Sequence, residues 1–75
     1  MRMNPMLPKD LTSIQTNLSP MDFYTLMGRF EADPEDFHQN HEMVLEGSVI
    51  RKYFHDGMYY QFIIEYGLLV SVMSI

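Results

Sequence analysis

The residues most suited to chemistry are two histidines three positions apart, in the run His38-Gln39-Asn40-His41-Glu42. On a helix, His38 and His41 would share one face, and His55 with a neighbouring acid could complete the nitrogen and oxygen donors that zinc prefers. The run lacks the His-Glu-x-x-His order of helical metalloproteases. We therefore expect exposed histidines in a turn and no metal. A small metal-binding protein built on His38, His41 and His55 remains an alternative.

Other catalytic patterns cannot be identified in the sequence. The chain has no cysteine, which excludes thiol nucleophiles, disulfide scaffolds and cysteine zinc sites. It shows no glycine-rich phosphate loop, no nucleophile elbow and no paired acid and base. A chain of 75 residues also has little room for a pocket that excludes water. We therefore expect a protein that is not an enzyme, with no catalytic residues and no cofactor.

The chain is acidic, with ten Asp and Glu against five Lys and Arg and a net charge of −5. Contact with a phosphate backbone needs clustered positive charge, so direct nucleic-acid binding is not expected. Carboxylates without any Lys or Arg between them occupy residues 31–46, among them Glu35 and Asp36. This run predicts either a solvated surface or an attraction for a basic protein partner.

The most apolar stretch, Met58–Ile75, contains Gln61 and Glu65. A carboxylate near the centre of a bilayer is costly, so this stretch favours buried strand over a membrane segment. The first 20 residues lack the apolar run of a secretory signal. We expect a soluble, cytoplasmic protein that does not associate with membranes.

The length predicts a single small domain over residues 1–75 with a helical part in residues 10–40. Residues 1–8 are expected to be extended or loosely packed, and a short helix is possible over Asp10–Leu18. Ser19 can cap a helix that begins at Pro20 and ends near Glu31. Three apolar side chains form one stripe along that helix, namely Phe23, Met27 and Phe30. A second Asp-Pro pair predicts a short helix or turn over Pro34–Asn40, with Phe37 reaching the core.

Residues 42–75 are rich in Val, Ile, Tyr and Phe, which predicts a β-meander. Asp56-Gly57 is the strongest turn signal and Tyr66-Gly67 a weaker one. The expected strands are therefore Met43–Phe54, Met58–Glu65 and Leu68–Ser74. A helix over residues 42–55 is the competing interpretation, opposed by Gly47 and the β-branched residues that follow it. The fold class is thus α+β, with short N-terminal helices packed on a three-stranded antiparallel β-meander.

A two-residue loop at Asp56-Gly57 fixes the pairing of the first two strands. It places Tyr53 opposite Tyr60 on one face and Ile50 opposite Ile63 on the other. It also places Gly47 opposite Tyr66, whose ring could cover the bare glycine. If the chain turns again at Tyr66-Gly67, counting away from that turn pairs Ile64 with Leu69, Tyr60 with Met73 and Ile63 with Val70.

In this register the last strand is apolar on both sides, although helices can cover only one face of so small a sheet. We expect the second face to be an interface, and its candidate residues are Ile50, Ile63, Leu68, Val70, Val72 and Tyr59, with Glu35 and Asp36 in the acidic run. A partner could also add a strand along Leu68–Ile75. The alternative is that the segment Met1–Leu18, including Ile14, covers this face.

Together these patterns predict a small acidic protein-binding module without catalytic activity. It would form a homodimer, bind a protein partner, or both, and so inhibit or modulate a macromolecular target. Inhibitors, immunity proteins, antitoxins and phage modulators share this composition. A structural subunit of a larger assembly is the first alternative, because a core of this size rarely supplies more than about 3–5 kcal/mol on its own.

Overall fold

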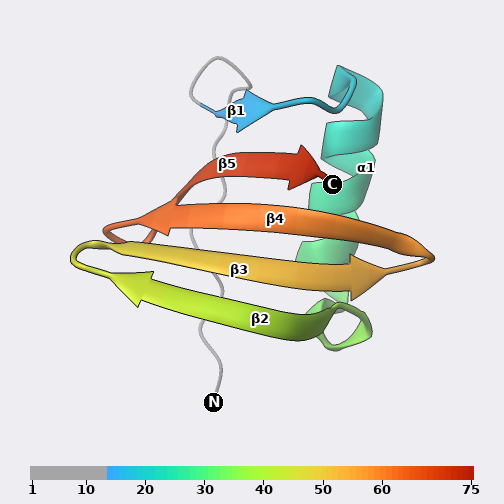
Figure 1. Ribbon diagram of the computed structural model, residues 1–75. Coiled ribbons are helices and arrows are strands. Elements are labelled where there is room, and N and C mark those ends of the chain that lie inside the picture. Colours follow the sequence, from blue (N-terminus) through green and yellow to red (C-terminus); the bar gives the residue numbers. More distant parts are fainter. Residues whose placement is uncertain (1–13) are drawn as a thin grey trace.

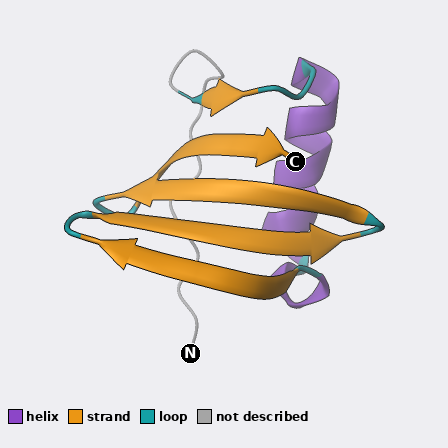
Figure 2. Ribbon diagram, viewed as in Figure 1, coloured by secondary structure: helices purple, strands orange, loops and turns teal. Residues whose placement is uncertain are grey.

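The computed structural model describes residues 14–75, which form a five-stranded mixed sheet with one α-helix across one face (Figures 1 and 2). The strand order is β1-β5-β4-β3-β2, and only β1 and β5 are parallel. The elements are β1 Gln15–Thr16, α1 Pro20–Ala32, the 3-10 helix η2 Pro34–Asp36, β2 His38–Leu45, β3 Ser48–His55, β4 Met58–Glu65 and β5 Leu68–Ser74. The predicted α+β class is confirmed, whereas the predicted sheet has three strands and the observed sheet has five.

Helix α1 follows from its local sequence. The Ser19 hydroxyl accepts a hydrogen bond from the Asp22 backbone N–H at 3.2 Å, and Pro20 occupies the first helical position. The predicted stripe of Phe23, Met27 and Phe30 is buried, together with Leu26. The helix therefore lies across the sheet with one apolar side inward, as its residue spacing requires.

The core lies between α1 and the sheet face that it covers. Phe30 is at its centre, with ring centroids 5.1 Å from Phe62, 5.5 Å from Tyr53 and 5.0 Å from Phe37. Tilted and edge-to-face contacts of this kind suit the quadrupoles of aromatic rings. The side chains of Ile14 and Leu18 also pack against this core, so these two residues do not cover the opposite face. Residues 1–13 of the segment that we considered as its cover lie outside the described part of the chain.

The strand predicted over Met43–Phe54 is wrong, because the chain turns within it. Strand β2 ends at Leu45, and β3 begins at Ser48 after a two-residue loop in which Gly47 has φ of +72°. Residues 38–55 therefore form a hairpin, which excludes the competing helix over residues 42–55. The helix or turn predicted over residues 34–40 is likewise confined to Pro34–Asp36.

The predicted pairing of β3 with β4 is confirmed at every position, including Tyr53 with Tyr60 and Ile50 with Ile63. Both residues of the Asp56-Gly57 loop have positive φ, at +49° and +80°, as such a loop requires. Tyr66 also covers Gly47 as predicted, since a Cβ on Gly47 would lie only 2.6 Å from Tyr66 Cζ.

The predicted pairing of β4 with β5 holds only at its start. Ile64 pairs with Leu69, but a bulge then inserts Val70, so that Ile63 pairs with Ser71 and Tyr60 with Ser74. Because a shift of one residue reverses every later side chain, Val72 faces α1 and is fully buried. Its assignment to the uncovered face is therefore wrong.

Strand β1 occupies the edge at which we expected a partner to add a strand. Gln15 and Thr16 pair in parallel with Ser71 and Val72 of β5. The short helix predicted over Asp10–Leu18 is therefore wrong for its second half, and its first residues lie outside the described part of the chain. Within residues 14–75, the two edge strands of the sheet are the short β1 and the longer β2.

Candidate protein interface

The sheet has an outer face, which we define as the face of β2–β5 opposite α1 (Figure 2). The strand register arranges its side chains in rows that run across the strands. The central row joins Met43, Ile50, Ile63 and Ser71, and the row nearer the Tyr66-Gly67 turn joins Leu45, Ser48, Glu65 and Leu68. The row on the other side of centre joins His41, Lys52, Gln61 and Met73, and the next joins His38, Phe54 and Tyr59.

The outer face is apolar at its centre and accessible around it. Ile50 and Ile63 are half-buried, and Ser71 at the β5 end of the central row is only 3% exposed, whereas Met43, Leu45, Tyr59 and Leu68 expose 42–52% of their surface. Phe54 and Tyr59 pair across β3 and β4 with ring centroids 4.9 Å apart. A set of such side chains on one face of a small domain is typical of an interaction surface.

Charge is distributed unevenly between the two faces of the sheet. On strands β2–β5 the carboxylates are Glu42, which faces α1, and Glu65, which lies on the outer face. The other acidic residues of the described chain lie on α1, on η2, at Asp33 between these two helices, or in turns. Lys52 lies two residues along β3 from Ile50 and is the only basic side chain on the outer face apart from histidines. The outer face therefore carries one unit of each charge.

The structure brings together most of the predicted interface residues but not all of them. Ile50, Ile63, Tyr59 and Leu68 share the outer face, and Val70 lies half-buried in the bulge beside Ile63. Val72 belongs to the core instead. Glu35 and Asp36 are in η2, next to the end of β3 on the helix side, so they form no common surface with the outer face.

The three histidines of the alternative metal site do not converge. His38 and His41 pair with Phe54 and Lys52 and so lie on the outer face, on either side of a bulge at Asn40. His55 faces α1, where its ring stacks on Phe37 with centroids 3.8 Å apart. In the described chain no group of three or more His, Asp or Glu side chains could hold a metal ion.

His55 has a structural environment on the helix side of the sheet. Its ring is 5% exposed, and Nδ1 lies 3.3 Å from both the backbone carbonyl oxygen and a carboxylate oxygen of Asp36. Both of these oxygens are acceptors, so the geometry favours the tautomer with a proton on Nδ1. This contact ties η2 to the end of β3.

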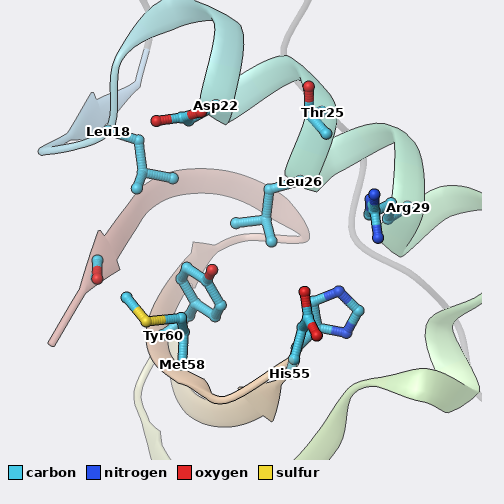
Figure 3. A pocket seen from close by; sticks show the side chains of 10 residues that line it. Leu18, Asp22, Thr25, Leu26, Arg29, His55, Met58 and Tyr60 are labelled. Carbon is cyan, nitrogen blue, oxygen red and sulfur yellow. The ribbon is translucent and has the colours of Figure 1, made fainter.

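A groove of about 300 Å³ lies beside His55, between α1 and the Asp56-Gly57 turn (Figure 3). The side chains of Asp22, Arg29 and Tyr60 line it. Burial of the Tyr60 hydroxyl, with the negative charges of Asp56 and Asp22, raises the pKa of Tyr60 above its usual value. The groove has mixed charge and is open to solvent, which suits contact with a polar group better than chemistry that needs water excluded. Sequence reasoning missed it, because its residues meet only in the folded chain.

An ion pair joins β2 and β3 across their hairpin. Arg51 Nε donates to Glu42 Oε2 at 2.8 Å, and Arg51 Nη1 donates to the Tyr53 hydroxyl at 3.4 Å. Partial burial lowers the pKa of Arg51, but the hydrogen bonds and the charge interactions with Glu42 and Tyr53 together raise that pKa overall. The side chain of Arg51 thus reaches from β3 to a carboxylate on β2.

Comparison of the chain with protein-family models, with curated proteins and with solved structures found no match. None of the helices within residues 14–75 is long and apolar enough to cross a membrane.

Proposed function

We propose that this chain is a small protein-binding module without catalytic activity and that its outer face is the binding surface. The observation that carries the proposal is the apolar central row of Met43, Ile50 and Ile63, which α1 does not cover. Burial of apolar surface drives most protein association, at about 25 cal/mol per Å² removed from water.

The distribution of charge supports the same function. Carboxylates repel one another and are costly to desolvate, so an acidic protein that associates through one face gains by keeping them away from it. Here they are concentrated on the helix side and in the turns, while the outer face carries Lys52 and Glu65. Bound to a target, the module would block or modulate it, with the acidic helix side turned to solvent.

A permanent structural subunit would use the same face and is the second candidate function. The exposed fractions of Tyr59 and Leu68, 48% and 42%, favour neither candidate, because both would bury these side chains in the complex. The two functions differ in the behaviour of the isolated chain. A subunit should aggregate without its assembly, and a free modulator should stay monodisperse in light scattering.

The test is affinity capture from host extract with the full chain, followed by rebinding of the purified partner. We expect Ile63→Asp to weaken that binding at least about tenfold, because it places a charge in the central row. Tyr59→Asp, at the exposed rim, is the second variant in case Ile63→Asp lowers folding stability. Met21→Asp on α1, where the side chain is 78% exposed, is the matched control and should bind normally. Equal binding by all three variants would refute the proposal.

A further inference from the structure

We propose that the outer face binds a second copy of the same chain, in a two-fold symmetric dimer in which Lys52 of each copy lies beside Glu65 of the other. This inference rests on the proposed function, since it takes the outer face to be an interface and names its occupant. It follows from the order of the rows on that face.

The apolar central row lies midway between the two charged positions. Ile50 pairs with Ile63, and two residues away on either side Lys52 pairs with Gln61 and Ser48 pairs with Glu65. Along the strands, the basic and the acidic position are thus equally far from the centre, at about 7 Å each. The face is therefore balanced about its central row, with opposite charge on the two sides.

A two-fold axis along the central row makes this arrangement self-complementary. Rotation about that axis stacks the central row on itself and places the Lys52–Gln61 row over the Ser48–Glu65 row of the second copy. Lys52 then lies over the second copy's Ser48, one strand spacing of about 4.8 Å from Glu65, which a lysine side chain can span. The Gln61 amide lies over Glu65 itself and can donate to it.

The size of the face is adequate for a weak dimer. Four strands of seven or eight residues form a surface of about 500 Å² at ~3.3 Å per residue and ~4.8 Å per strand. Two copies would bury about 1,000 Å² together, which is the lower limit for a specific interface. We therefore expect a dissociation constant on the order of micromolar or weaker.

A dimer with this symmetry makes each charge contact twice. Reversal of one charge, by Lys52→Glu or by Glu65→Lys, creates two repulsive contacts in a dimer of identical copies. In an equimolar mixture of these two variants, the introduced acid of one lies beside the introduced base of the other, and the unchanged Lys52 and Glu65 keep their contact. The mixture should therefore form heterodimers even where each variant alone is monomeric.

The experiment is sedimentation velocity of the full chain over a wide concentration range. We expect the mass to rise from 8.9 kDa toward twice that value. Each single variant should weaken dimerisation at least about tenfold, and the mixture should return to within about threefold of the wild type. Glu31→Lys and Arg29→Glu, exposed on α1, carry the same charge changes away from the outer face and serve as matched controls. Circular dichroism confirms that all variants are folded.

The possible outcomes separate this inference from the function on which it rests. A monomer at all concentrations, or a dimer that neither variant weakens, or variants that mixing does not rescue would overturn the symmetric dimer. If the chain is monomeric but Ile63→Asp abolishes capture of a different protein, the dimer is wrong and the binding function stands. If Ile63→Asp and Tyr59→Asp change neither self-association nor capture, both proposals are wrong.

Discussion

The side chain of Asn17 takes the place of a strand residue beside Ser74. Its Nδ2 donates to the Ser74 carbonyl oxygen at 2.9 Å, and its Oδ1 accepts from the Ser74 N–H at 2.8 Å. The amide of Asn17 thus satisfies both backbone groups of a β5 residue just beyond the two-residue strand β1. The backbone of β5 at Ser74 is therefore paired without a longer strand β1.

We expect Asn17→Ala to lower the free energy of unfolding by about 1–2 kcal/mol, since two hydrogen bonds of about 0.5–1.5 kcal/mol each are lost. Urea denaturation measures this loss. Gln15→Ala is the control, because its exposed side chain can be removed while its backbone pairing with Ser71 stays. An equal loss of unfolding free energy in both variants would mean that the two hydrogen bonds of the Asn17 amide do not stabilise the fold.

Gly28 lies on the exposed side of α1, and a Cβ placed on it would meet no atom within 4 Å. We therefore expect Gly28→Ala to raise the free energy of unfolding by about 0.5–1 kcal/mol, because it restricts the unfolded chain and favours helix. Thermal unfolding followed by circular dichroism measures the gain. Destabilisation would show that the new methyl group meets a neighbour, contrary to the open space around Gly28.

Gly57 has φ of +80° and open space around it, so only backbone strain opposes a side chain there. A β-branched residue resists this conformation, and we expect Gly57→Val to lower the free energy of unfolding by about 2 kcal/mol. Chemical denaturation measures it. A neutral result would mean that the turn of β3 and β4 adjusts its geometry.

Gly47 has a similar φ but lies under the ring of Tyr66. We expect Gly47→Ala to cost more than Gly57→Ala, because the new methyl group displaces that ring as well. The extra cost, about 0.5–1 kcal/mol, should disappear in a Tyr66→Ala background, as a double-mutant cycle would measure. Tyr66 is 89% exposed, so its ring can rotate away and the coupling should be modest. Additive effects would mean that the Tyr66 ring moves away from the new methyl group without a measurable loss of stability.

Tyr60 makes the folded state sensitive to alkaline pH. Burial and the charges of Asp56 and Asp22 raise the pKa of Tyr60 in the folded chain, so this hydroxyl ionises at lower pH when the chain is unfolded. The folded state then holds more protons above about pH 10, and stability falls as the pH rises through the folded-state pKa. Stability measured between about pH 9 and about pH 11 should decline less in Tyr60→Phe than in the wild type. Tyr66→Phe, at an exposed position, is the control.

The elements that the sequence predicts correctly are those with a local physical cause. Ser19 and Pro20 determine where α1 begins, through a cap and a fixed φ. Asp56 and Gly57 determine the pairing of β3 with β4, because a two-residue loop that needs positive φ leaves a single register. The cover of Gly47 by Tyr66 then follows from counting along that register.

The missed elements have weaker local signals. The turn at Glu46-Gly47 lacks the Asn or Asp that usually precedes glycine in such loops, so it was hidden inside one predicted strand. The bulge at Val70 carries no distinctive residue, although it moves Val72 from the outer face to the core.

The sequence by itself determined the helix, the apolar residues available for the core, the central hairpin and the acidic charge of this protein. Each of these depends on residues close together in the chain. Only the tertiary structure decided that Gln15–Thr16 pairs with β5, that β2 is an edge strand and that His55 lies apart from His38 and His41. These relationships depend on backbone groups and packing between distant segments, which local residue preferences do not encode. The placement of Lys52 and Glu65 on opposite sides of Ile50 and Ile63 depends on both sequence and tertiary structure. The sequence supplies these residues and their spacing, and the sheet brings them to a common face.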